Sequence, residues 1–225
     1  MFLEFHFWRY FFTRGTLFTN LAETETIRGF KKCVSIVLAC TILLYILMNT
    51  WGMTTTSLTS LYVIGFTDTY TVARWISLVG ITIFAVLYFC FHFFGVSQLL
   101  HIVTKVPLRI AAIMQLYVLA ILLIEKLLVF VVFNLVGFTT PFSFLSFGPL
   151  AVQFLEFEYF HYFFNQFSVF TALIISIQYQ FLRSFTDVSR KLLLIILLLM
   201  TAAFASIVAL ISIVPWNQLL AGGAI

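Results

Sequence analysis

Charged residues are scarce in this chain. Only 9% of its 225 residues are Asp, Glu, Lys or Arg, whereas 63% are hydrophobic and the mean hydropathy is +1.12. Soluble domains carry about 25% charged and about 45–50% apolar residues. The composition therefore excludes a soluble domain. It also excludes a disordered chain, which needs low hydrophobicity and high net charge. We expect a protein of the lipid bilayer.

Cysteines and catalytic motifs are also few. An odd set of three thiols, Cys33, Cys40 and Cys90, lies in or beside apolar runs, where it is typical of small buried hydrophobes rather than of a disulfide framework. The sequence has no phosphate-binding Gly-rich loop, no serine-hydrolase elbow and no His-Glu-x-x-His motif. Glu158-x-x-His161 lacks the second copy that a di-metal bundle site needs. We therefore expect no enzyme, cofactor or metal site.

Long apolar runs dominate what is present. A helix needs about 20 mainly apolar residues to cross a hydrocarbon layer of about 30 Å. Five stretches are predicted as spans, near residues 33–51, 72–99, 110–136, 166–182 and 192–214, and the fourth is the shortest. Runs such as LLLIILLLM lack the alternation of barrel strands. The predicted fold is an all-α integral membrane helical bundle with about five transmembrane helices.

Basic residues predict the orientation, because cytoplasmic loops keep an excess of Lys and Arg. Of the twelve, ten fall on one side of the predicted spans: Arg9, Arg14, Arg28, Lys31, Lys32, Lys105, Arg109, Arg183, Arg190 and Lys191. This places the N-terminus in the cytoplasm and the C-terminus outside, in a cell membrane. Residues 1–32 are an aromatic segment expected at the cytoplasmic membrane surface, and residues 33–225 form the transmembrane domain. Such dispersed clusters do not indicate a nucleic-acid surface.

Glu125 and Lys126 are the most informative residues, since they stand near the middle of the third span. Each charge costs about 2.5–3.5 kcal/mol at the centre of a span. Neighbours on a helix point about 100° apart, so each needs its own partner. Candidate partners are Gln115, Asn134, Gln178, Gln180, His92 and Tyr179. Pairing inside the bundle, pairing with another subunit and a transport path all remain open.

Two outer connections differ in character. Residues 52–71 are rich in Thr and Ser and are interpreted as a polar connection without chemistry. Residues 137–165 are full of Phe, although Pro141 and Pro149 interrupt them. This segment either rests on the outer leaflet and the top of the bundle or presents a docking surface for a membrane protein or an amphipathic ligand. The docking candidates are Phe142, Phe144, Phe147, Phe157 and His161.

The last third of the chain resembles the closing helices of the Yip (Ypt/Rab-interacting protein) family. The similar features are an aromatic start at residues 164–167, a moderately polar helix VFTALIISIQYQF, a short loop containing Ser189, Arg190 and Lys191, and the strongly apolar LLLIILLLMTAAFASIVALI. The five predicted spans and the cytosolic N-terminus are similar too. Because few residues precede the first span, the chain resembles short bacterial members rather than the eukaryotic ones that meet Rab GTPases.

The resemblance implies an accessory or assembly subunit of a membrane transport complex, of the ABC exporter type, with ABC permease, ATPase and adaptor subunits as partners and a role in toxic-peptide export or resistance. One alternative is a small permease that uses Glu125. A second is a Yip-type protein of membrane trafficking.

Overall fold

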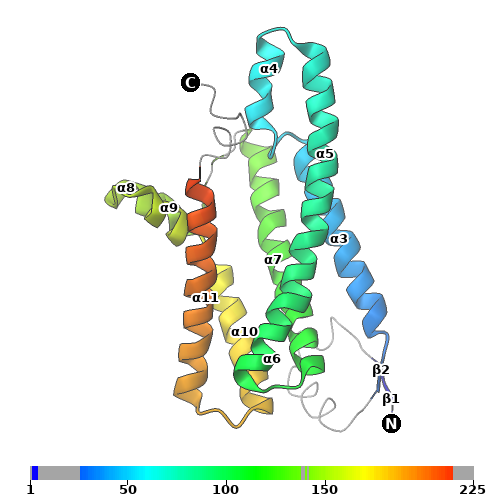
Figure 1. The fold of residues 1–225 in the computed structure, drawn as a ribbon, viewed down its shortest axis with the longest axis vertical. Coiled ribbons are helices and arrows are strands. Elements are labelled where there is room, and N and C mark those ends of the chain that lie inside the picture. The colour runs from blue at the N-terminus through cyan, green and yellow to red at the C-terminus, as the bar shows by residue number, and fades with distance from the viewer. Residues whose placement is uncertain (1, 5–25, 138–139, 141, 215–225) are drawn as a thin grey trace. The chain divides into compact units, whose positions relative to one another are not determined.

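The computed structural model describes residues 2–4, 26–137, 140 and 142–214. Apart from two short strands, β1 (Phe2–Glu4) and β2 (Thr26–Arg28), which pair in parallel, its elements are helices (Figure 1). Four helical segments are long and apolar enough to cross a membrane. This agrees with the predicted class of helical membrane protein. The aromatic N-terminal segment lies mostly outside the described residues.

The four long segments lie close to four of the predicted spans. They are α3 (Phe30–Thr50), a continuous rod made of α5 (Thr67–Cys90), the π-helical turn η2 (Phe91–Gly95) and α6 (Val96–Thr104), then α7 (Leu108–Val136) and α11 (Arg190–Ile213). The rod exceeds the predicted 72–99 at both ends. The remaining predicted span, 166–182, corresponds to α10 (Val169–Phe185), which has only 17 residues.

Helix ends follow from local backbone chemistry. Lys105 ends α6 in the left-handed region with φ 60°, and its N–H bonds the His101 carbonyl. Pro107 lies just before α7. Because a proline has no backbone N–H, α6 cannot continue through this residue. At the other end of α7, Gly137 takes φ 80° and donates to the Phe133 carbonyl at 2.8 Å, as a helix-terminating glycine does.

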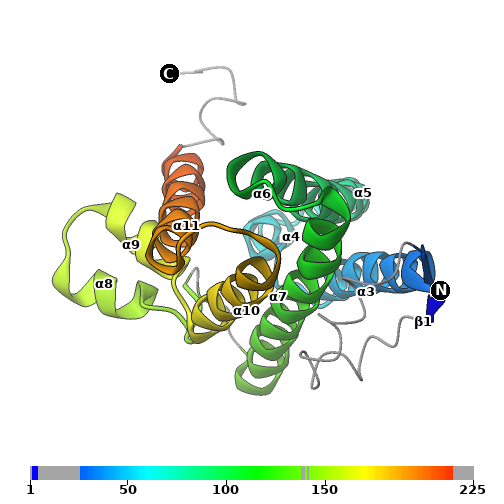
Figure 2. The ribbon, with the colours of Figure 1, turned by 90° about the horizontal axis from the view of Figure 1, so that it is seen from below.

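The chain divides into two compact units, which are described separately. The first comprises Met1–Thr139 with Ser184–Thr186, and the second Thr140–Arg183 with Asp187–Ile225. In the first unit α3 packs against both α5 and α7, and α6 packs against α7 (Figure 2). The N-terminal half of α7 is the most buried part of this unit: Ile113, Met114, Leu116 and Leu119 are fully buried.

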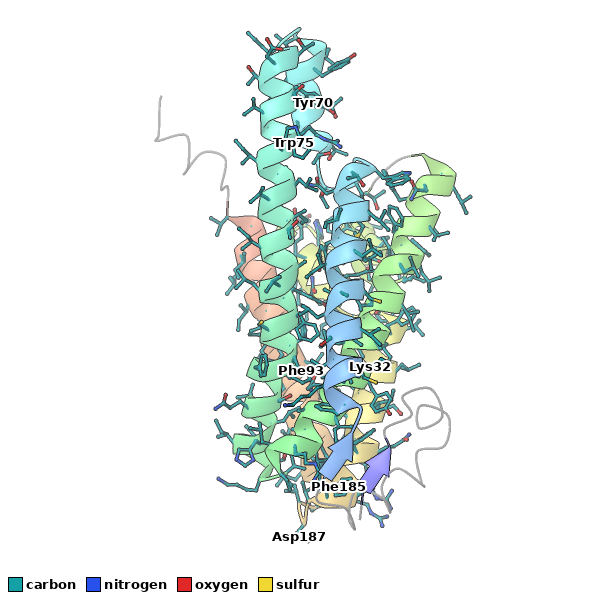
Figure 3. All side chains as sticks on the ribbon, turned by 90° about the vertical axis from the view of Figure 1, so that its right-hand side faces the viewer. Lys32, Tyr70, Trp75, Phe93, Phe185 and Asp187 are labelled. Carbon is teal, nitrogen blue, oxygen red and sulfur yellow. The ribbon has the colours of Figure 1, made fainter. Side chains whose placement is uncertain are left out.

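One end of the α5–α6 rod extends past its neighbour α3. The rod has 38 residues, about 57 Å at about 1.5 Å per residue, whereas α3 has 21, about 31 Å. Arg74 fixes their register, because its guanidinium donates to the Thr50 carbonyl and to Thr55 Oγ1, both at 3.0 Å. Figure 3 shows Tyr70 and Trp75 on the projecting part of α5.

Residues 52–71 connect α3 to the first turn of α5, but they are more helical and more apolar on the surface than the interpretation as a polar connection implied. The segment contains a 3-10 turn, η1 (Thr56–Leu58), the helix α4 (Thr59–Val63) and the first turn of α5. It exposes large apolar side chains, namely Tyr62, Val63, Ile64 and Phe66. The many threonines hide this pattern in the sequence, because they lower the mean hydropathy without preventing helices.

The second unit contains a helical hairpin inside the Phe-rich connection. It consists of α8 (Gly148–Phe154) and α9 (Glu158–Asn165), which pack against each other, and α9 packs on α11. Pro149 does not break α8, because it lies in the first turn, where its missing N–H has no helical partner to lose. Figures 1 and 2 show the hairpin extending sideways from α11.

Candidate intramembrane charge site

Lys126 is held between two tyrosines from neighbouring helices. Its Nζ lies 5.4 Å from the ring centroid of Tyr45 on α3 and 5.2 Å from that of Tyr88 on α5. The negative face of an aromatic ring attracts a cation within about 6 Å, and more strongly where water is excluded. Lys126 thus joins α3, α5 and α7 at one point, where two rings lie around its ammonium group.

Further rings extend this cluster along α5. Tyr45 and Tyr88 lie 5.7 Å apart between centroids, and the His92 imidazole lies 4.5 Å from the Tyr88 ring. His92 belongs to the π-helical turn η2. A π turn leaves a carbonyl without its usual partner, and here the Ser97 hydroxyl donates to the Phe93 carbonyl. Such turns frequently occur at functional sites.

Glu125 differs sharply from its neighbour. Its side chain is half-buried in the same part of α7, but within the described part of its unit it has no hydrogen bond or ion pair. The helical angle of about 100° between consecutive residues explains why it does not share the tyrosine pair. A carboxylate in apolar surroundings is costly unless another group neutralises it or hydrogen-bonds to it. Its electrostatic interactions are with Lys126 and Tyr88. The site therefore has one charge held between two rings and one carboxylate without a hydrogen-bond donor among the described residues.

The candidate partners of Glu125 and Lys126 that the sequence suggested have different surroundings in the structure. Asn134 donates to the Phe130 carbonyl of its own helix at 3.0 Å. Gln115 is fully buried, and neither polar atom of its side chain has a hydrogen-bond partner among the described residues. Gln178, Tyr179 and Gln180 lie on α10, in the second unit. Of the candidates in the first unit, His92 belongs to the Lys126 cluster, through its contact with the Tyr88 ring.

Sequence reasoning missed Tyr45 and Tyr88, although one signal could have found them. Tyr45 lies 15 residues after the start of α3 at Phe30, Tyr88 lies 16 before the end of α6 at Thr104, and Lys126 lies 18 after the start of α7. At about 1.5 Å per residue, all three lie about 22–27 Å from the same end of the unit. Matching depths along antiparallel helices would have brought them together.

The structure separates the five predicted docking residues into two groups. Phe142 packs on His161, with ring centroids 6.1 Å apart, and the His161 Nε2 lies 2.7 Å from the Leu155 carbonyl oxygen, so both side chains are half-buried. Phe144, Phe147 and Phe157 are instead 53%, 56% and 71% exposed.

Asn165 joins the two ends of the hairpin, a role that the sequence did not indicate. Its Oδ1 accepts a hydrogen bond from the Ser143 N–H at 2.9 Å and lies 2.7 Å from the Ser146 hydroxyl. A Cβ added at Gly148 would lie only 2.8 Å from the same oxygen, so the close approach requires glycine. The Phe147 N–H also bonds the Phe167 carbonyl at 3.0 Å.

Within the described ranges, no group of three or more His, Cys, Asp and Glu side chains is arranged to hold a metal ion. No protein-family model, curated protein or solved structure matches the chain.

Proposed function

We propose that this chain is a non-enzymatic, multi-pass protein of the cell membrane that assembles with other membrane subunits as an accessory part of a transport complex. The observation that carries the proposal is Glu125, a half-buried carboxylate in α7 that makes no hydrogen bond or ion pair among the described residues of its unit. Pairing with a donor or a cation on another membrane subunit would offset the cost of burying it.

The proposed topology has five crossings, with the N-terminus in the cytoplasm and the C-terminus outside. The basic pairs Lys31–Lys32 and Lys105–Arg109 flank the same end of α3, α6 and α7, while Arg74 lies toward the opposite end. This asymmetry supports the first three crossings. Arg183, Arg190 and Lys191 at the α10–α11 turn support a cytoplasmic turn and hence two more crossings.

The type of complex follows from the resemblance to short bacterial Yip-type proteins. An ABC exporter supplies its own ATPase and translocation path, so an accessory subunit needs neither. The exporter would bring the permease, ATPase and adaptor, and toxic-peptide export is the activity that the resemblance implies. The Lys126 cluster would keep α3, α5 and α7 together while Glu125 meets the partner.

Affinity purification tests this proposal. The tagged chain is extracted from its native membrane in mild detergent, and the proteins that accompany it are quantified by mass spectrometry. Glu125→Gln should lower the recovery of a stoichiometric membrane partner while leaving the amount of membrane-inserted chain unchanged. Glu158→Gln is the matched control, because Glu158 is exposed and lies outside the long helices. Equal partner recovery with the unmodified chain, Glu125→Gln and Glu158→Gln would contradict the role of Glu125.

A small permease is the second candidate, and the same half-buried carboxylate favours it, since substrate or ion paths often contain an intramembrane acid. It predicts that the purified chain has no stoichiometric partner. In liposomes, the chain alone would then produce substrate flux that is lost in Glu125→Gln and kept in Glu158→Gln. Stoichiometric partners together with no flux would exclude the permease.

A further inference from the structure

The α8–α9 hairpin is covered with large apolar side chains on its outside. They come from the segment before α8, from α8 itself, from the connection between the helices and from α9. They are Phe144, Phe147, Leu150, Phe154, Phe157 and Phe160, with exposed fractions between 39% and 80%. The exposure of α8 is not confined to one face, because Leu150 and Val152 point about 200° apart on the helix and are 52% and 44% exposed.

Several polar side chains of the hairpin form hydrogen bonds within it. Asn165 and Ser146 bond each other and the backbone where the two ends of the hairpin meet. The His161 Nε2 lies within hydrogen-bond distance of the Leu155 carbonyl oxygen, in the connection between the helices. In hydrocarbon every backbone polar group needs an internal partner, because no water is present to replace one. An apolar exterior around internally bonded polar groups is the arrangement that lipid favours.

The charges of the hairpin lie at one place. Between Lys126 and Arg183 the chain has no Lys or Arg, and its only acidic residues there are Glu156 and Glu158. Both are exposed and lie at the connection between α8 and α9. This is the end of the hairpin farthest from the contacts of Asn165 with Ser143 and Ser146, which we call the Asn165 clamp. If the hairpin pointed toward the bilayer centre, burying these carboxylates would cost about 2.5–3.5 kcal/mol each. A hairpin lying across the membrane plane lets them reach the headgroups.

Helix lengths give the depth of the clamped end. From their common turn, α10 extends 17 residues, about 25 Å, and α11 extends 24 residues, about 36 Å. The outer end of α10, where the chain enters this helix, therefore lies about 10 Å short of the outer end of α11. Figure 1 shows α9 beside α11 below that end. The exposed side chains of α11 near this depth, including Ile207, Val208 and Leu210, continue the apolar surface.

We propose that α8 and α9 form a membrane-embedded hairpin that lies in the outer half of the bilayer, with its phenylalanines among lipid acyl chains and its two carboxylates at the headgroup level. The two ends of the hairpin meet at the Asn165 clamp, and the chain continues from there into α10. The short α10 then needs to cross only the remaining thickness. This inference depends neither on Glu125 nor on a protein partner.

Tryptophan quenching in liposomes tests the embedding. In the full chain, Trp8, Trp51, Trp75 and Trp216 are replaced by Phe, and a single reporter is introduced by Phe154→Trp, at an 80% exposed position. The protein is reconstituted at a high lipid-to-protein ratio in phosphatidylcholine brominated either near the glycerol or near the methyl end of the acyl chains. Aqueous acrylamide serves as the water-side quencher.

Two matched reporters calibrate the result. Val63→Trp lies on the projecting α4, with 78% of the native side chain exposed, and should respond to acrylamide. Phe181→Trp replaces a side chain that is 2% exposed and should respond weakly to every quencher. Phe154→Trp should lose more emission to bromolipid than either control, most with bromine near the glycerol, and less than Val63→Trp to acrylamide.

Two results would overturn the proposal. Quenching of Phe154→Trp by acrylamide but not by bromolipid would place the hairpin in water, and weak quenching by both would mean that protein covers it. If the tryptophan-free chain fails to fold, Phe154→Cys and Val63→Cys, each with Cys33, Cys40 and Cys90 replaced by Ser, give an independent measurement. A membrane-impermeant maleimide, added from both sides, should label Val63→Cys and spare Phe154→Cys, and equal labelling would again overturn the embedding.

Discussion

Removing the ring of Tyr88 should weaken the bundle, and part of that loss should come through Lys126. A cation over a ring contributes about 2 kcal/mol or more when water is excluded. Tyr88→Leu also removes ring contacts with Phe84 at 6.3 Å and His92 at 4.5 Å, at about 0.5–1.5 kcal/mol per aromatic pair. In the Lys126→Met background the cation contact is already absent, whereas the ring contacts of Tyr88 remain. A double-mutant cycle of Tyr88→Leu and Lys126→Met should therefore show a coupling of about 2 kcal/mol, roughly 30-fold in the unfolding equilibrium constant.

The coupling can be measured by equilibrium unfolding of the full chain in mixed micelles of mild detergent and dodecyl sulfate, followed by far-ultraviolet circular dichroism. Tyr88→Phe should keep most of it, because the ring remains. Tyr70→Leu is the matched control, since Tyr70 pairs with Tyr62 at 5.4 Å on the projection beyond α3. Its effect should add to that of Lys126→Met within about 0.5 kcal/mol. A similarly small coupling for Tyr88 would show that the ring does not stabilise the ammonium.

Two further substitutions probe the polar contacts of each unit. Gly148→Ala should loosen the hairpin by about 1–3 kcal/mol, because the new methyl would lie 2.8 Å from Asn165 Oδ1, and hydrogen exchange should accelerate in residues 142–168 but not in α3. Unchanged exchange there would mean that the clamp yields without loss. Asn49→Ala should destabilise the first unit by about 1–3 kcal/mol, because Asn49 is 2% exposed and donates to Ser77 Oγ at 2.9 Å. A lower dodecyl sulfate midpoint is expected, and an unchanged one would argue against a stabilising role for this bond.

The sequence was sufficient for the class of fold and for the approximate position of the helices. A run of apolar residues forms a helix in lipid for reasons that are local to the run, so α3, α7 and α11 begin and end within three residues of the predicted spans. The ends of the α5–α6 rod were underestimated, because the threonines near its start read as a polar loop and His101 and Thr104 near its end interrupt the apolar run.

The candidate site was harder to predict, since its contacts join separate helices. Glu125 and Lys126 are conspicuous as charges in an apolar run, but a chain with 29 Phe and 9 Tyr offers too many rings to identify the two that surround Lys126. The hairpin was missed for a different reason. Proline was taken as a breaker at Pro149, although its position in the first turn of α8 is compatible with a helix.

The π-helical turn between α5 and α6 determines the rotational phase of the rod. Side chains four residues apart drift by about 40° per step around an α-helix of 3.6 residues per turn, so three such steps would carry them about 120° away from one face. Ala85, Phe89, Phe93 and Ser97 nevertheless are all buried. The wider turn at Phe91–Gly95 absorbs most of that drift. Its one additional residue therefore lets the face of α5 that carries Tyr88 and the face of α6 that packs on α7 belong to a single continuous side of the rod.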